Sequence, residues 1–173
     1  MRLFFALTFD NKAKSDLMTY QNLLRVHGMD GRVTPKQNLH ITLAFIGECT
    51  ENQKQTLIDI LRQLKSGCGS LRIDHLGSFR QKRSRLVWLG MANNRALTRL
   101  QKELVTALIE QGFSTESKAY IPHITIVRRV PGNPQLKDIH IKPRQISVYS
   151  IALMESVYQE NRLVYQVIDE VIQ

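Results

Sequence analysis

The stretch NLHITLAF, which spans Asn38–Phe45, is followed later in the chain by IPHITIVR, which spans Ile121–Arg128. Both copies place His-Ile-Thr and a following aliphatic residue inside an apolar run. In an extended strand, side chains two residues apart lie on the same face, and neighbouring side chains lie on opposite faces. Each copy therefore predicts a strand that presents one histidine and one threonine together, with aliphatic residues buried behind them.

In the first copy, His40 and Thr42 are expected to project from one face, while the opposite, core-facing side carries the apolar residues Leu39, Ile41, Leu43 and Phe45. In the second copy, His123 and Thr125 project in the same way, and the buried residues are Ile124 and Ile126. If the two strands face each other, two imidazoles and two hydroxyl groups converge.

Similar elements precede the two copies. Hydrophobic periodicity predicts a strand at Arg2–Phe9, a helix at Lys12–His27 and a strand at Leu39–Ile46. Before the second copy, the sequence RLVWLGM predicts a strand and Asn94–Gln111 predicts a helix. This pattern indicates an α+β fold of two similar lobes, related by approximate two-fold symmetry, with a cleft between them. Because no linker or change of composition separates the lobes, we expect one bilobal domain over residues 1–173.

The remaining segments predict one more helix and further strands. Thr50 and Gln53 have the spacing of a capping box, so a helix is expected to begin there and to end before the loop 66–70. The sequences LRIDHLGSF and RLVWLGM, joined by a basic stretch, predict a pair of strands. Beyond the loop Pro131–Pro134, strands are expected at Arg144–Met154 and Leu163–Ile172.

The composition favours a nucleic-acid partner. The 173 residues include 24 Lys and Arg against 15 Asp and Glu, which gives a formal charge of +9 and favours polyanions. A membrane partner is not expected, because no segment approaches the roughly 18 consecutive apolar residues of a membrane span. The apolar stretch after Arg2 ends at Asp10 without a cleavage site, so it is interpreted as a strand rather than a signal peptide. Cys49 and Cys68 form no metal or disulfide pattern, which favours a cytoplasmic location.

The two His-x-Thr pairs suit phosphodiester chemistry. One neutral imidazole can take a proton from water while a protonated imidazole gives a proton to the departing oxygen, and histidine titrates near neutral pH. Threonine hydroxyls can donate hydrogen bonds to phosphate oxygens. No metal or other cofactor is expected, because neither His40 nor His123 has a partner at ligand spacing. The other histidines repeat no pattern and are expected to be structural or solvated: His27, His75 and His140.

These residues resemble the signature of the two-histidine (2H) phosphoesterase superfamily, which consists of two His-x-Thr/Ser-x-hydrophobic motifs. The resemblance is closest to its branch of RNA 2′,3′-cyclic phosphodiesterases, formerly called 2′-5′ RNA ligases. RLFFAL, NLHITLAFIGE, RLVWLGM and PHITIVR lie in the family's order, so the similarity covers about residues 2–130. The C-terminal part departs from the family, which often has a glycine before its last Tyr-containing strand where this chain has Asn161 and Arg162.

The resemblance implies a bilobal α+β fold, with antiparallel sheets flanking a basic cleft and helices outside. It also implies opening of RNA 2′,3′-cyclic phosphate ends to 2′-phosphomonoesters without a metal. By the same carry-over, His40 would protonate the leaving 3′ oxygen, His123 would activate water, and Thr42 and Thr125 would hold the phosphate. Arg128, which matches the arginine that closes the second motif in this branch, would contribute to substrate binding. Because the two motifs are alike in sequence, the sequence alone does not show which histidine is the general acid and which is the general base.

Phe45 and Arg128 both lie five positions after their motif histidine, so they occupy equivalent places in the two lobes. Our hypothesis is that they flank the terminal nucleobase by stacking and a cation–π contact. Because five is an odd number, an ideal pleat turns both away from the histidine face, and a bulge or a strand end is needed. The alternative is that Phe45 is a core residue and Arg128 a solvated strand end.

Three functions remain open from the sequence. The leading hypothesis is a phosphodiesterase that acts on RNA ends. The second hypothesis keeps the same site but has the enzyme cleave or ligate 2′-5′ linkages, or open a small cyclic nucleotide. The third hypothesis is a noncatalytic RNA-binding module. The expected partner is therefore RNA with a 2′,3′-cyclic phosphate or a 2′-5′ linkage. A monomer is expected because one chain supplies both histidines. Basic residues predicted to line the cleft or its rim are Arg80, Lys82, Arg83, Arg85, Arg128 and Arg129.

Overall fold

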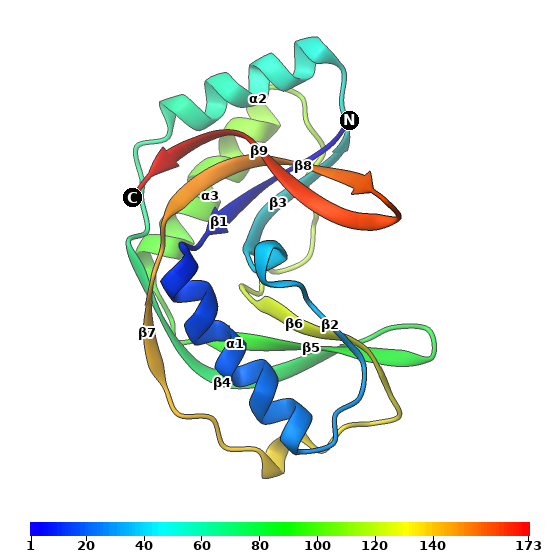
Figure 1. Ribbon diagram of the computed structural model, residues 1–173. Coiled ribbons are helices and arrows are strands. Elements are labelled where there is room, and N and C mark those ends of the chain that lie inside the picture. Colours follow the sequence, from blue (N-terminus) through cyan, green and yellow to red (C-terminus); the bar gives the residue numbers. More distant parts are fainter.

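The computed structural model describes residues 1–173 as two antiparallel sheets and three α-helices (Figure 1). The first sheet has the order β3-β1-β8-β9, from β1 (Arg2–Thr8), β3 (Ile41–Glu48), β8 (Ser150–Gln159) and β9 (Arg162–Ile172). The second has the order β2-β6-β5-β4-β7, from β2 (Arg32–Val33), β4 (Ser70–Arg80), β5 (Ser84–Met91), β6 (Ile124–Pro131) and β7 (Arg144–Ser147). The predicted α+β class with two antiparallel sheets is confirmed.

The helices are α1 (Asn11–Val26), α2 (Glu51–Gln63) and α3 (Arg95–Glu110), with short 3-10 turns at η1 (Lys36–Asn38) and η2 (Leu136–Asp138). The predicted capping box begins α2, because the Thr50 hydroxyl accepts from the Gln53 amide at 3.2 Å and the Gln53 side chain accepts from the Thr50 amide at 2.8 Å. The two helices that precede the motif strands each pack against the sheet to which their preceding strand does not belong. α1 follows β1 of the first sheet but packs near β6 of the second, and α3 follows β5 of the second but packs near β3 of the first.

Strand β1 is buried on both of its faces. Leu3, Phe5 and Leu7 belong to the main hydrophobic core, whereas Phe4 and Ala6 pack in a smaller cluster on the opposite face. A continuous apolar run, rather than alternation, is typical of a strand covered on both sides. The smaller cluster forms an apolar floor beside the first motif, since the rings of Phe4 and His40 lie 5.3 Å apart.

The strand predicted at Arg144–Met154 is wrong as a single element. It divides into β7, which pairs with β4 of the second sheet, and β8, which pairs with β1 of the first. At the crossing, the Val148 amide donates to Gly69 O and the Tyr149 amide donates to Thr8 O, both at 2.9 Å, so consecutive residues bond to different sheets. The two lobes are therefore not sequential halves of the chain, because the C-terminal hairpin β8–β9 completes the first sheet.

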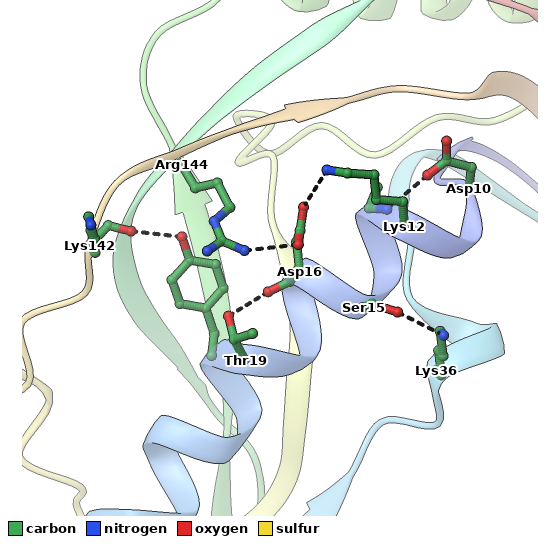
Figure 2. Close-up of polar contacts among 10 residues, drawn as sticks. Asp10, Lys12, Ser15, Asp16, Thr19, Lys36, Lys142 and Arg144 are labelled. Atoms are coloured by element: carbon green, nitrogen blue, oxygen red, sulfur yellow. Dashed lines mark hydrogen bonds and ion pairs between the residues drawn. The ribbon is translucent and has the colours of Figure 1, made fainter.

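Polar contacts tie α1 to the second sheet and to η1 (Figure 2). The Asp16 carboxylate binds Arg144 of β7 at 3.1 Å and Lys12 at 3.4 Å. On the side of η1, the Lys36 ammonium donates to the Ser15 hydroxyl at 2.9 Å. Each contact is exposed and contributes little free energy by itself. Together they join the helix to β7 in one direction and to the start of the first motif in the other.

Two glycines allow aromatic rings to lie flat on the β4–β5 hairpin. Gly77 faces Trp88 across the hairpin, and Gly90 faces His75. An added Cβ would come within 2.3 Å of the Trp88 ring at Gly77 and within 2.1 Å of the His75 ring at Gly90. The absence of side chains at both positions therefore determines where these rings lie.

We predict that Gly77→Ala destabilises the protein, because Trp88 is 8% exposed and has little room to move. Overpacking of this kind costs about 1–3 kcal/mol, which urea unfolding monitored by tryptophan fluorescence would measure. Gly69→Ala is the matched control, since a Cβ there meets nothing within 4 Å. An unchanged unfolding midpoint for Gly77→Ala would show that the Trp88 ring has another place to go.

Candidate active site

The two motifs meet in a cleft of about 140 Å³ between the sheets. Strands β3 and β6 begin one residue after the motif histidines, belong to different sheets and come into contact where the two sheets meet (Figure 1). The cleft brings together all six site residues predicted from the sequence, which are His40, Thr42, Phe45, His123, Thr125 and Arg128. Three more residues line it that the sequence analysis did not single out: Phe4, Ser156 and Tyr165. The missed residues come from strands of the first sheet without a polar motif, so no local pattern marks them.

The two histidines are held in the same way. His40 Nδ1 donates to the Asn38 carbonyl and His123 Nδ1 donates to the Ile121 carbonyl, each at 2.7 Å. Because a carbonyl only accepts, these bonds place the proton of each neutral ring on Nδ1 and leave Nε2 as the free acceptor. In the first motif, the Thr42 hydroxyl lies 3.0 Å from His40 Nε2. Both rings thus present the same nitrogen for proton transfer.

A bulge lies at the third residue after each histidine. On β3, Thr42 pairs with Ala6 and Ala44 with Phe5, so Leu43 has no partner on β1. On β6, Thr125 pairs with Trp88 and Val127 with Val87, so Ile126 has no partner on β5. An extra residue in one strand reverses which side the following residues face.

The bulges change the expected direction of the fifth residue in both motifs. Phe45 was expected on the core-facing side of the pleat, and that expectation is wrong: its side chain is 46% exposed and lines the cleft. Arg128 lines the same cleft from the other sheet. Of the two devices expected from the odd offset, a bulge or a strand end, a bulge lies before both residues.

Each bulged carbonyl accepts a hydrogen bond from a glutamine of the crossing helix. Gln21 of α1 is 5% exposed, and its Nε2 donates to Ile126 O at 3.1 Å and to Thr34 O at 3.0 Å. Gln101 of α3 donates from Nε2 to Leu43 O at 3.4 Å. The Ile126 carbonyl also accepts from the Thr34 amide of the chain beside β6 at 3.0 Å, so the Gln21 bond is a second bond to that carbonyl. The helices therefore stabilise the bulges of the opposite lobe.

Aromatic rings enclose both histidines. Around His40, Tyr165 lies at 4.9 Å in an edge-on arrangement, in addition to Phe4. Around His123, Phe79 lies edge-on at 5.0 Å and Trp88 lies at 5.7 Å. Rings at these separations pack favourably and exclude water from one side of each imidazole. Both motif histidines thus have a dry side formed by neighbouring strands and an open side toward the cleft.

Two further hydrogen bonds fix the spacing of the motifs. The Asn38 amide, 6% exposed, donates from Nδ2 to Leu163 O at 2.9 Å, which ties β9 to the residue that orients His40. The Tyr120 hydroxyl donates to Thr42 O at 2.7 Å, which links the segment before the second motif to the strand of the first. Neither residue could be recognised from sequence, because the partners are distant in the chain.

Burial and positive charge lower the pKa of both histidines. Burial is the largest effect on His40 and lowers its pKa to about 4, with Arg128 as a further cause; the bond to Asn38 acts in the opposite direction. The pKa of His123 is also lowered, first by burial, and Arg128 again contributes. In the free protein both imidazoles are therefore neutral at pH 7.

Most of the predicted basic rim does not line the cleft. Of the six residues, only Arg128 contributes to its wall. Arg80, Lys82 and Arg83 are exposed at the turn of the β4–β5 hairpin, and Arg85 donates to the Ser78 hydroxyl at 3.1 Å. A place for the other five residues on the rim of the cleft stays a prediction, and exposed Lys and Arg are common on any protein surface. None of the helices is long and apolar enough to cross a membrane.

Comparison with known protein families shows to which family the chain belongs. The family model of the 2′-5′ RNA ligase superfamily matches residues 24–155, a segment that includes both motifs. The chain belongs to the 2′-5′ RNA ligase superfamily. This membership confirms the resemblance to 2H phosphoesterases that the two His-x-Thr motifs indicated.

Curated members of the superfamily are similar over most of the chain. The RNA 2′,3′-cyclic phosphodiesterase of Methanocaldococcus jannaschii is 29% identical, covering 98% of this chain and 99% of the relative. That of Aquifex aeolicus is 31% identical, covering 81% and 80%. The apo crystal structure of E. coli LigT superposes with a TM-score of 0.78 at 24% identity, covering 99% of this chain and 96% of that one. The crystal structure of TT0787 from Thermus thermophilus gives 0.80 at 22% identity, covering 99% and 97%. At these identities the structures establish the fold.

We predict that replacing Arg128 by methionine raises the pKa of both motif histidines, because the guanidinium charge disfavours imidazolium at both sites. Titration of the imidazole signals by NMR would measure the shift. Arg128→Lys keeps the charge and is expected to leave the histidine titrations close to those of the wild type. If methionine and lysine give the same titration curves, burial alone lowers the two pKa values.

Proposed function

We propose that this protein hydrolyses 2′,3′-cyclic phosphates at RNA ends to 2′-phosphomonoesters, without a metal, using His40 and His123 as the acid–base pair. The observation that carries the proposal is the matched pair of histidines, each oriented by a backbone carbonyl and each presenting Nε2 to one cleft beside a threonine. Two positioned imidazoles supply both proton transfers that the opening of a cyclic phosphodiester requires. Curated relatives named RNA 2′,3′-cyclic phosphodiesterase support the same reaction.

In the proposed mechanism, His123 Nε2 takes a proton from a water molecule as its oxygen forms a bond to phosphorus. The bond from phosphorus to the 3′ oxygen breaks, and His40 Nε2 gives that oxygen a proton, which leaves a 3′ hydroxyl and a 2′-phosphomonoester. Thr42 and Thr125 donate hydrogen bonds to the non-bridging oxygens, where negative charge develops. The proton taken from water returns to His40 through solvent between turnovers, so the reaction consumes water alone.

The lowered pKa of His40 bears on its role as the acid. A neutral imidazole has no proton to give at Nε2, so His40 must be protonated when substrate binds. The anionic cyclic phosphate favours this, because a nearby negative charge raises the pKa of an imidazole. For the free protein, kcat/KM is therefore expected to fall as pH rises through the pKa of the acid, which lies below the usual value of about 6.5.

The terminal nucleobase is proposed to lie between Phe45 and Arg128, as their equivalent positions suggested. The Arg2 guanidinium lies 5.6 Å from the centroid of the Phe45 ring and supports it from β1. Stacking of a base on an aromatic ring and a guanidinium is tolerant of sequence. The expected partner is accordingly RNA of varied sequence, bound by a monomer that carries the complete site. The cytoplasmic location stays a prediction.

A second candidate function keeps the same residues and acts on 2′-5′ linkages, as the description of the superfamily suggests. In the direction of ligation, His123 takes a proton from a 5′ hydroxyl whose oxygen bonds to phosphorus, and the bond to the 3′ oxygen breaks as His40 protonates it; cleavage of a 2′-5′ linkage is the reverse. A noncatalytic RNA-binding module is less well supported, because stacking and phosphate binding do not need two imidazoles with the same free nitrogen.

We predict that His40→Ala and His123→Ala each lower the rate of hydrolysis by at least about a hundredfold, the range for lost acid or base catalysis. The assay uses an oligonucleotide that ends in a 2′,3′-cyclic phosphate, with a chelator present, and identifies the isomer of the product. His140→Ala, at an exposed position outside the cleft, is the matched control. An intact cyclic phosphate with the wild-type protein would contradict the proposed reaction, and loss of activity with the chelator would contradict its metal independence.

We further predict that the two glutamines act through the residues that their bulges orient. Gln21→Met and Gln101→Met keep side-chain length but remove the donor, and a lost hydrogen bond of about 1 kcal/mol corresponds to a roughly fivefold lower kcat/KM. If Gln21 acts through Arg128, adding Gln21→Met to Arg128→Ala causes no further loss. The same is expected when Gln101→Met is added to Phe45→Ala.

Crossed pairs provide the control for this prediction, because Gln21→Met should add its full effect to Phe45→Ala. Gln63→Met, at an exposed position on α2, controls for the substitution itself. Equal, additive losses in all four pairs would show that the glutamines affect stability and not the orientation of the site.

A further inference from the structure

A second hollow, of about 490 Å³, lies beside the cleft on the side of His123. Trp88 forms part of its wall and also packs against the His123 ring at 5.7 Å. Ile121 and Pro122, the two residues before His123, line it as well. The opposite wall is the start of α3, including Thr98 and Gln101. The hollow therefore lies next to the residues that position His123, one of the two proposed catalytic residues.

Size distinguishes the two spaces. Ligand pockets in proteins usually measure about 300–1,000 Å³, and the cleft at the histidines, at about 140 Å³, is smaller than this. The cleft is assigned to the reacting phosphate, with its terminal base between Phe45 and Arg128, so a further nucleoside of the RNA must lie outside it. The neighbouring hollow, at about 490 Å³, is within the usual range.

The wall of the hollow offers surfaces suited to a planar base. The His75 ring lies on the Gly90 backbone, and its side chain is 53% exposed. Ile121 is 49% exposed, which leaves a large aliphatic side chain uncovered at the same hollow. Aromatic and apolar side chains that flank an open space are the surfaces on which proteins stack unpaired bases.

The polar groups of the hollow suit a nucleoside and not a phosphate. Although the chain carries a formal charge of +9, no lysine or arginine lines this space. The side chain of Asn93 is exposed there, and Gln101 uses only its Nε2 for the bond to Leu43 O. Amide groups of this kind donate to and accept from the edges of bases.

We propose that this hollow binds a second nucleoside of the substrate, next to the nucleotide whose phosphate lies between the two histidines. The base stacks on His75 and against Ile121, and the amides of Asn93 and Gln101 bind its edge. The inference rests on the proposed function and extends it, because it makes an oligonucleotide a better substrate than a mononucleotide. The second nucleoside is either the next residue of the same strand or the nucleoside across a 2′-5′ linkage.

The test fills the hollow without touching the histidines. Thr98→Phe places a ring in it from an exposed position of α3, and Thr106→Phe, also exposed on α3 but outside the hollow, is the matched control. The substrates are a nucleoside 2′,3′-cyclic phosphate, a dinucleotide that ends in a 2′,3′-cyclic phosphate, and a dinucleoside monophosphate with a 2′-5′ linkage. The wild type is expected to show a roughly tenfold higher kcat/KM on at least one dinucleotide than on the mononucleotide, in line with the stacking of one base.

Thr98→Phe is expected to remove that advantage and to leave hydrolysis of the mononucleotide unchanged, while Thr106→Phe changes neither. Loss on the dinucleotide with the cyclic end identifies the occupant as the next residue of the strand. Loss on the 2′-5′ dinucleotide identifies the nucleoside across the phosphate. His75→Ala provides the same comparison if Thr98→Phe does not fold.

Equal kcat/KM on mononucleotide and both dinucleotides, or equal losses on all three in the variants, would overturn the second site. Failure of the wild type to open the cyclic phosphate of both the mononucleotide and the dinucleotide that carries one would instead overturn the proposed function.

Discussion

The bulge at the third residue of each motif is the constraint on which the site depends. A regular strand would place His and Thr on one side and the fifth residue after the histidine on the opposite side, because side chains alternate. One unpaired residue, Leu43 in β3 and Ile126 in β6, brings all three to the cleft. The repeated motif is therefore a repeat of backbone geometry as well as of chemistry, and Gln21 and Gln101 each donate a hydrogen bond to the carbonyl of the bulged residue.

Arg128 has two effects in the same site. Its charge lowers the pKa of both histidines in the free protein, while its position in the cleft suits an anionic substrate. When a phosphate binds, its negative charge offsets that of the guanidinium. The two histidines then lose part of the influence that keeps them neutral, so binding and protonation are linked. In such a site, protonation of the general acid His40 is favoured when a phosphate is bound.

The sequence predicted the parts of the fold that depend on local pattern. Helices with clear caps were placed correctly, as with Thr50 and Gln53, and the two motifs identified the histidines that converge. The division of Arg144–Met154 into β7 and β8 was missed, because continuous apolar residues give no sign that a strand has changed sheets. Cleft residues such as Tyr165 and Ser156 were missed as well, since they reach the site by pairing between distant strands. The bulges were anticipated only because Phe45 and Arg128 share an odd offset.

The crossing of α1 and α3 between the sheets has a consequence for how the protein unfolds. Each lobe supplies the helix that supports the other lobe's motif, and the hairpin β8–β9 completes a sheet that begins with β1. Neither lobe thus contains everything that its own strand needs. We expect the two lobes to lose structure in one cooperative transition, and half-chains expressed separately to remain incomplete until they are mixed.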